Sequence, residues 1–180
     1  MIEPKDSAPE KYYGKYRGFV VNNVDIERRG RVTVMVPNLG TGLLLCAEPC
    51  FPATGLPGFA SGMFAVPAIG AGVFVEFIGG EIDQPIWSGG FPGTTASMPV
   101  DNTAAAPGLE PLTIQSGAMK VTVANHQIEI GTAGGPGSAL LNGISITPGS
   151  ITFMVGGASF VLTPAGIDLN KATITLVGAG

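Results

Sequence analysis

Charged residues are scarce in the C-terminal part of this sequence. Within residues 111–180 only Lys120, Glu129, Asp168 and Lys171 carry a charge, whereas about a quarter of the residues in an ordinary soluble domain are charged. Short apolar stretches separated by glycine fill the segment instead. Such a segment cannot leave its apolar faces in water, so we expect it to bury them against other copies of itself.

Other features that the sequence lacks exclude further classes of protein. No run of about twenty apolar residues is present, so no transmembrane helix is predicted. The first residues lack the basic region and apolar core of a secretory signal, and we expect the protein to be made in a cytoplasm. The net charge is −4, and Arg28, Arg29 and Arg31 stand beside Asp25 and Glu27, which indicates a solvated turn. No nucleic-acid partner is predicted.

Metal-ligating residues are equally few. Cys46 and Cys50 are the only cysteines and His126 is the only histidine, which is too few ligands for a zinc site. On one extended strand the two cysteines would lie about 13 Å apart, too far for a disulfide, so we expect two free, partly buried thiols. For His126 we expect a hydrogen bond at a strand edge or between chains. No metal and no cofactor are predicted.

No combination of residues predicts catalysis. Glu81 and Asp83 are close in sequence, but they occupy an expected turn rather than a cleft. His126 has no serine or cysteine nearby in the context of a nucleophile. Residues 131–137 are glycine-rich, but they lack the Lys-Ser/Thr pair of a phosphate-binding loop, and no helix is expected after them. We therefore predict that the protein is not an enzyme.

Apolar and polar residues alternate along the C-terminal segment with the period of two that a half-buried strand requires. Glycine or proline separates the stretches, which begin at positions 144, 151, 160, 167 and 174. We predict that the apolar positions form the core of a trimer: Ile144, Ile146, Ile151, Phe153, Val155, Phe160, Leu162, Ile167, Leu169, Ile174 and Leu176.

The spacing of about one strand per step favours an intertwined triple-stranded β-helix, or β-prism. A single-chain solenoid needs roughly twenty residues per coil to enclose its own core. Three chains would instead supply one wall each, and their strand edges would pair with neighbouring chains. A glycine-rich β-sandwich and a disordered tail are the alternatives, since 28 glycines and 15 prolines would allow disorder. The regular alternation argues against disorder.

The N-terminal half predicts a small barrel, so the fold class is all-β. Five short strands with one long connection between the third and the fourth are typical of the OB fold. Phe19, Phe74, Phe77 and Trp87 are expected mostly at core positions. The strands are expected over residues 18–24, 30–37, 43–46, 72–78 and 84–90, with a long glycine- and proline-rich loop over 47–62.

Composition also sets the expected domain boundaries. Tyr12, Tyr13 and Tyr16 would be unusual on a free tail, so they either bind a partner or pack on the barrel of their own chain. The first strands after the linker are expected over 112–115, 119–124 and 127–130. The expected parts are an N-terminal arm (1–16), the OB barrel (17–91), a linker (92–111) and a β-helical needle (112–180).

Several stretches resemble one family, that of contractile-tail spike proteins. Its members include the baseplate assembly protein V group of phages and the VgrG spikes of type VI secretion. Ser159-Phe-Val-Leu-Thr-Pro-Ala-Gly-Ile-Asp-Leu is similar to the needle repeats of these proteins. The stretches that resemble their OB domain are Gly18-Phe-Val-Val-Asn-Asn, Gly30-Arg-Val-Thr-Val-Met-Val-Pro, Val66-Pro-Ala-Ile-Gly, Gly72-Val-Phe-Val-Glu-Phe and Asp83-Gln-Pro-Ile-Trp-Ser-Gly-Gly.

The resemblance implies a homotrimer in which three barrels surround the top of a needle. The barrel end would meet a separate hub protein, because no hub domain precedes the barrel, and Tyr12, Tyr13 and Tyr16 are the candidate contacts. The His-x-His motif that binds iron at the tip of many short spikes is absent, so no iron is expected. A separate PAAR-type protein would instead cap the C-terminal end, on a platform that includes Thr173, Thr175, Val177, Gly178, Ala179 and Gly180.

We therefore expect the central spike of a contractile injection machine, namely a phage tail, a tailocin or a related particle. The trimeric needle would contact the target envelope transiently as it pierces it. Phe160→Asp or Ile151→Asp is predicted to prevent assembly of the trimer. An OB-fold module that binds oligonucleotides or oligosaccharides, and a trimeric fibre or adhesin, are the alternatives.

Overall fold

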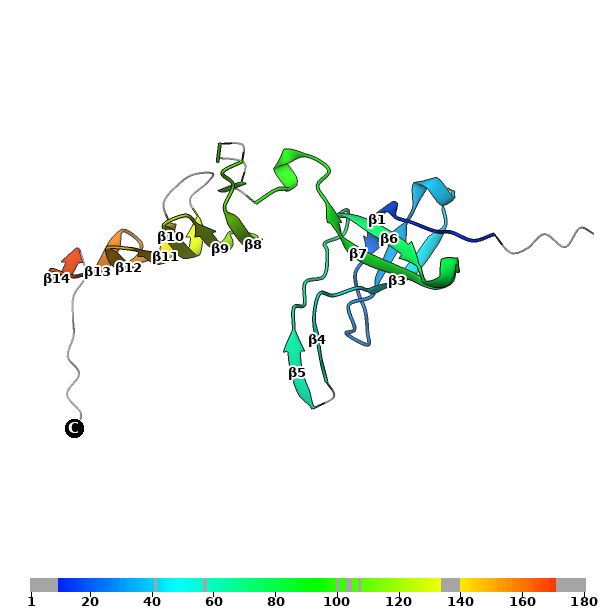
Figure 1. Ribbon diagram of the computed structural model, residues 1–180, viewed down its shortest axis with the longest axis horizontal. Helices are drawn as coiled ribbons and strands as arrows, with labels where there is room; N and C mark the ends of the chain where they lie inside the picture. The colour runs from blue at the N-terminus through cyan, green and yellow to red at the C-terminus, as the bar shows by residue number, and fades with distance from the viewer. Residues whose placement is uncertain are drawn as a thin grey trace, which may run out of the picture. The chain divides into compact units, whose positions relative to one another are not determined.

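Alternating valine-rich strands form a closed barrel in the N-terminal part of the computed structural model (Figure 1). The barrel strands pair in the order β1-β2-β3-β7-β6. β3 and β7 run parallel, and the other neighbours run antiparallel. The strands are β1 (Tyr16–Asn22), β2 (Val32–Met35), β3 (Leu44–Pro49), β6 (Gly72–Phe77) and β7 (Pro85–Phe91).

The structure describes residues 10–40, 42–56, 58–99, 101–102, 105–106, 108–133 and 140–170. The chain divides into two compact units, with the boundary between Gly93 and Thr94. Among the described residues, no helix has both the length and the apolar character needed to cross a membrane.

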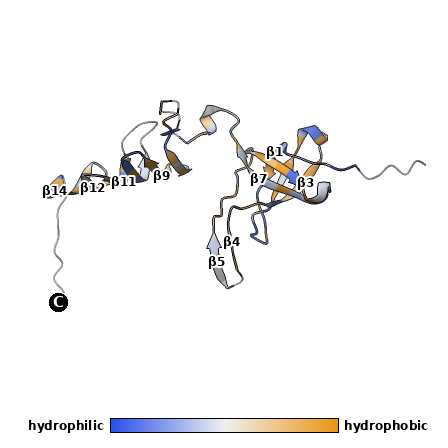
Figure 2. Cartoon of the chain, in the orientation of Figure 1, coloured by the Kyte–Doolittle hydropathy of each residue, from blue (hydrophilic) through white to orange (hydrophobic). Residues whose placement is uncertain are grey.

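The barrel core confirms the predicted inward positions. Val32, Val34 and Val36 are fully buried, and so are Val73 and Val75. The hydrophobic colour along the barrel strands in Figure 2 follows from this packing. The complete core is Val20, Val32, Val34, Val36, Ala47, Val73, Val75, Phe77 and Trp87.

Two of the four aromatic residues expected in the core lie on the outside of the barrel. Phe77 and Trp87 are buried as predicted, but Phe19 is 38% exposed and Phe74 is half-buried. Because Val20, like Gly18, points into the core, the alternation of β1 directs Phe19 outward. The prediction is therefore wrong for Phe19 and Phe74.

The long connection between β3 and β6 contains a hairpin that the sequence analysis did not predict. β4 (Thr54–Leu56) and β5 (Phe59–Gly62) pair antiparallel and form a two-stranded sheet of their own. Gly62 makes this pairing possible, since a side-chain Cβ there would lie 2.5 Å from the carbonyl oxygen of Ala53. The glycine and proline content that predicts a loop over 47–62 thus belongs in part to a strand pair.

The connections between the other consecutive barrel strands contain fewer residues than the β3–β6 connection. The turn before β2 is organised by the buried Asp25 carboxylate, which accepts hydrogen bonds from the backbone of Glu27, Arg29 and Arg31 and from the Arg31 guanidinium. The pKa of Asp25 lies far below its usual range, mainly because of the hydrogen bond from the Arg31 guanidinium and also because of these backbone amides. The 3-10 helices are η1 (Pro37–Leu39), η2 (Ile78–Gly80) and, in the second unit, η3 (Thr95–Ser97).

The second unit contains one seven-stranded antiparallel sheet whose strands follow one another in chain order from β8 to β14 (Figure 1). Three of them were expected over 112–115, 119–124 and 127–130, and the structure confirms them. The strands are β8 (Leu112–Ser116), β9 (Met119–Ala124), β10 (Gln127–Ala133), β11 (Leu140–Thr147), β12 (Ser150–Val155), β13 (Ala158–Thr163) and β14 (Gly166–Asn170).

Two-residue turns join most of these strands into consecutive hairpins. Gly156 and Gly157 both have positive φ, which suits the turn between β12 and β13. These turns bring each strand against the next strand of the same chain. The prediction that strand edges pair with neighbouring chains is therefore wrong for the described strands between β8 and β14.

Candidate functional site: the apolar face of the C-terminal sheet

The register of the second sheet aligns its apolar residues in two uninterrupted rows on one face. Each row takes one residue from every strand, because all six strand pairs keep the same alternation. One row is Leu112, Val123, Ile128, Ile146, Ile151, Leu162 and Ile167. The other row is Ile114, Val121, Ile130, Ile144, Phe153, Phe160 and Leu169. We call these two rows the apolar face.

The apolar face is exposed in the single chain. Apart from the half-buried Ile144 and Phe160, its side chains are between 36% and 68% exposed. Neighbouring side chains contact one another across the strands, as in the Phe153–Phe160 pair at 5.9 Å between ring centroids. A continuous exposed surface of this kind marks an interaction site, since soluble monomers rarely keep one.

The opposite face of the sheet has the opposite chemistry. Its cross-strand row runs through Thr113, Thr122, Glu129, Ser145, Thr152, Val161 and Asp168. Lys120, Glu129 and Asp168 all alternate onto this face. The few charges of the described part of the sheet therefore lie away from the apolar face.

One buried ion pair on the polar face ties the linker to the sheet. The Lys120 ammonium lies 2.6 Å and 2.8 Å from the two carboxylate oxygens of Asp101 and 3.3 Å from Glu129. The Thr122 hydroxyl donates to the same Asp101 carboxylate at 2.7 Å. Burial by itself raises the pKa of Asp101, but the hydrogen bonds from Lys120 and Thr122 lower it below its usual value. The Asp101 carboxylate therefore fixes residues 101–102 against β9 through Lys120 and Thr122.

A glycine pair allows unusually close approach between β10 and β11. Gly131 and Gly143 are register partners. A Cβ on either would lie 2.1 Å from a carbonyl oxygen of the opposite strand, and Gly143 has a φ of +146°. Only glycine fits this crossing without a shift of the backbone.

The structure places the described members of the predicted trimer core together. Ile144, Ile146, Ile151, Phe153, Phe160, Leu162, Ile167 and Leu169 all belong to the two rows, and Val155 alternates onto the same face. Ile174 and Leu176 lie outside the described residues. Sequence reasoning missed the members contributed by β8, β9 and β10, although the same period of two marks them: Leu112, Ile114, Val121, Val123, Ile128 and Ile130.

The three tyrosines proposed as hub contacts have different environments. Tyr12 and Tyr16 pack against Phe77, with ring centroids 5.8 Å and 5.5 Å away. The Tyr12 amide also donates to the carbonyl of Gly80 at 2.9 Å. Tyr13 is 70% exposed. The chain's own barrel thus holds Tyr12 and Tyr16, which leaves Tyr13 as the accessible member of the set.

The remaining candidate positions are the tip platform, the two cysteines and His126. The tip platform, residues 173–180, lies outside the described residues. Cys46 and Cys50 are free but exposed, so the expectation of partial burial is wrong. His126 lies in the exposed turn between β9 and β10 rather than on a strand edge, because Asn125 and His126 form the two-residue hairpin turn. In the described ranges, no group of three or more His, Cys, Asp or Glu residues could hold a metal ion.

The first unit is similar to a known family of domains. No curated protein matches the chain. Residues 16–91 match the model of a family described as the Type VI secretion system/phage-baseplate injector OB domain. The match begins at the first residue of β1 and ends at the last residue of β7, and so it covers the five-stranded barrel. Over residues 16–91 the chain is therefore similar to Type VI secretion system and phage-baseplate injector OB domains.

Proposed function

We propose that this protein is the central spike of a contractile injection machine. Three chains assemble with their apolar faces inward, and the resulting needle pierces the target envelope. The observation that carries the proposal is the pair of apolar rows that runs without interruption from β8 to β14. The family of the barrel supports it, because these OB domains are parts of injectors.

A three-walled prism would bury the apolar face of each sheet and leave the polar face in solvent. One sheet is too narrow to enclose its own apolar face, and it has no second described layer to cover it. Three such sheets related by a threefold axis would bury their apolar rows against one another and present Glu129 and Asp168 outward. Burial of apolar surface supplies the driving force for assembly, at roughly 25 cal/mol per Å².

The two ends of the spike would bind different proteins. A hub protein at the end of the tail tube would contact the barrels, with the exposed Tyr13 ring as a candidate anchor. A PAAR-type tip protein would bind at residues 173–180. The assembled spike would be a component of a phage baseplate or a related particle. The chain would act mechanically, without catalysis.

The oligomeric state tests the proposal. We expect light scattering to give a mass of three times 18.2 kDa for the purified protein, and we expect the trimer to resist SDS at room temperature. Ile151→Asp would place three carboxylates in the trimer interior and prevent assembly. Thr152→Asp is the matched control, because it adds the same charge one residue away on the polar face. Wild-type monomers, or a stable trimer of the Ile151→Asp variant, would refute the needle.

One observation favours a second candidate function, the binding of single-stranded oligonucleotides by the barrel. Phe19, Phe74 and Phe91 gather on the outer barrel surface, and the Arg17 guanidinium lies 5.1 Å from the centre of the Phe91 ring. Aromatic platforms beside basic residues bind single strands in this way. The net charge of −4 opposes it. Binding of fluorescent single-stranded DNA that weakens with added salt would support this function over the spike.

A further inference from the structure

The β4–β5 hairpin is an uncharged projection from an otherwise charged barrel. No charged residue occurs between Glu48 and Glu76. Figure 1 shows the hairpin extending away from the barrel strands, and β4 and β5 pair only with each other. An isolated two-stranded hairpin is marginally stable in water, and its open edges invite pairing unless charges protect them. This hairpin has no such protection.

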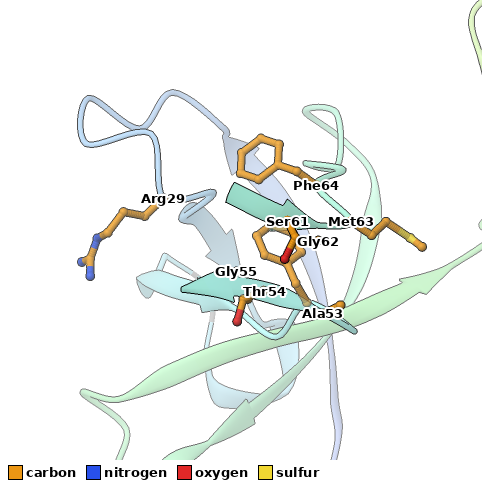
Figure 3. Close-up of a pocket in the computed structure, with 9 residues that line it drawn as sticks. Arg29, Ala53, Thr54, Gly55, Ser61, Gly62, Met63 and Phe64 are labelled. Carbon is orange, nitrogen blue, oxygen red and sulfur yellow. The ribbon is translucent and has the colours of Figure 1, made fainter. Parts of the chain in front are cut away.

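Large apolar side chains on the hairpin and directly after it are exposed. Leu56 is 74% exposed, Met63 is 55% exposed and Phe64 is 64% exposed. A cavity of about 500 Å³ lies at the base of the hairpin. Figure 3 shows Met63 pointing away from the strands and Arg29 directed away from the hairpin. Arg29 is paired with Glu27 and Glu48, so the cavity gains no free cation from it.

The base of the hairpin is anchored to the barrel core. The Phe51 ring lies 5.2 Å from Phe64 and 5.5 Å from the buried Trp87. The Trp87 indole in turn donates to the Gly30 carbonyl at 3.1 Å, and Phe51 packs so closely on Gly30 that a Cβ there would lie 2.8 Å from the ring. The Phe64 ring is thus held against a fixed base, which lowers the entropy that it loses on binding.

The same barrel carries a second apolar surface on β1, β6 and β7, where Phe19 is 38% exposed and Phe74 and Phe91 are half-buried. We call Phe19, Phe74 and Phe91 the outer aromatic cluster. The Phe91 ring centroid lies 5.9 Å from Phe19 and 5.3 Å from Phe74. The exposed Val21 lies two residues after Phe19 and shares its face of β1. The hairpin and the outer aromatic cluster therefore offer two different apolar surfaces within one unit.

We propose that in the assembled protein the β4–β5 hairpin of one chain docks on the outer aromatic cluster of the next chain. A ring of identical subunits needs two different complementary patches on each copy, and closes when the rotation between copies divides a full turn. The aromatic rings and the hairpin side chains are apolar, and the one charged group placed over the cluster, the Arg17 guanidinium, already lies 5.1 Å from the centre of the Phe91 ring. Three such contacts between hairpin and cluster would then join the three barrels in a ring.

This inference rests on the proposed trimer, which also explains why a small contact suffices. Once the C-terminal sheets hold three chains together, hairpin and cluster meet at a high effective concentration, typically millimolar for tethered sites. A second copy also fits better than an acidic or basic partner, because such a partner would leave its charges unpaired against an uncharged hairpin.

Site-specific photo-cross-linking of the full chain tests the inference. A benzoylphenylalanine at position 56 is irradiated in the assembled protein, and the boiled sample is separated on an SDS gel. We expect covalent dimers and trimers, with peptide mass spectrometry locating the attachment within residues 17–21, 72–74 or 89–91. Position 26 is the control, since Ile26 is 93% exposed but lies in the charged turn before β2. The same probe there should give no covalent oligomer.

The outcomes separate this inference from the proposed function. Phe19→Asp should abolish cross-linking from position 56 while light scattering still reports a trimer. A trimer in which the position 56 probe links only within its own chain, or links between chains at another surface, would overturn the inference and leave the spike intact. Monomers in solution would overturn both. Cross-links that form only with an added hub protein would assign the hairpin to the hub and overturn the second-copy contact.

Discussion

Removal of the Phe153 side chain gives a quantitative test of the buried apolar face. Phe153 is 42% exposed in the single chain, and a phenylalanine side chain offers about 200 Å² of surface, so about 85 Å² would become buried in the trimer. At about 25 cal/mol per Å², Phe153→Ala should cost the trimer about 2 kcal/mol per chain, or about 6 kcal/mol for three chains.

This loss corresponds to a change of about 10⁴-fold in the constant for dissociation into three chains. Because that constant scales with the square of the concentration, the concentration at which half of the chains are trimeric should rise by about 100-fold. Sedimentation in a fixed moderate concentration of guanidinium chloride measures this midpoint. Thr152→Ala on the polar face should leave it within about threefold of wild type. An unchanged midpoint for Phe153→Ala would refute the inward orientation of the apolar face.

Three further predictions concern the ordered parts of each unit. Gly143→Ala should lower the free energy of unfolding of the second unit by about 1–3 kcal/mol from backbone strain alone. Gly149→Ala is the control and should have little effect on the melting temperature, because a Cβ at position 149 would meet no other atom. Equal melting temperatures for the two variants would contradict the close approach of β10 and β11. The lowered pKa of Asp101 means that its pairing with Lys120 stabilises the protein above the ordinary aspartate pKa and is lost as the pH falls through the lowered value. Asp101→Asn should therefore be less stable at pH 7 and lose less stability on acidification, and parallel acid denaturation profiles of variant and wild type would contradict this. Trp87→Phe removes a buried hydrogen bond and should destabilise the barrel by about 1–3 kcal/mol in urea unfolding, while an unchanged urea midpoint would exclude that role.

The sequence predicts the barrel strands and the period of the C-terminal sheet because both depend on local alternation. Val32, Val34 and Val36 alternate with Thr33 and Met35, and the three valines are the buried members of this stretch. The C-terminal strands follow the same rule, so the residues predicted for the trimer core share one face.

The features that sequence reasoning missed depend on contacts between distant residues. Phe19 is as apolar as Phe77, and only the inward position of Gly18 and Val20 decides that it points outward. The ion pair of Lys120 with Asp101 joins residues 19 positions apart, and no local pattern indicates it. Likewise, the glycines of the β4–β5 hairpin predict a loop from the sequence, and only the contact of Gly62 with the Ala53 backbone explains why they belong to paired strands.

The chain-order pairing of β8 to β14 has a consequence for how such a sheet can change its length. All the strand connections except that between β10 and β11 are two-residue turns, and such a turn fixes the register of its hairpin. An added strand would therefore contribute one residue to each apolar row and leave the orientation of both faces unchanged. One strand extends the sheet by roughly 4.8 Å, the spacing between neighbouring strands. Duplication or loss of a single hairpin would therefore lengthen or shorten the sheet by about 10 Å and leave the surrounding pairings unaltered. Reach is thus a modular property of this sheet, set by the number of hairpins and independent of the barrel that precedes it.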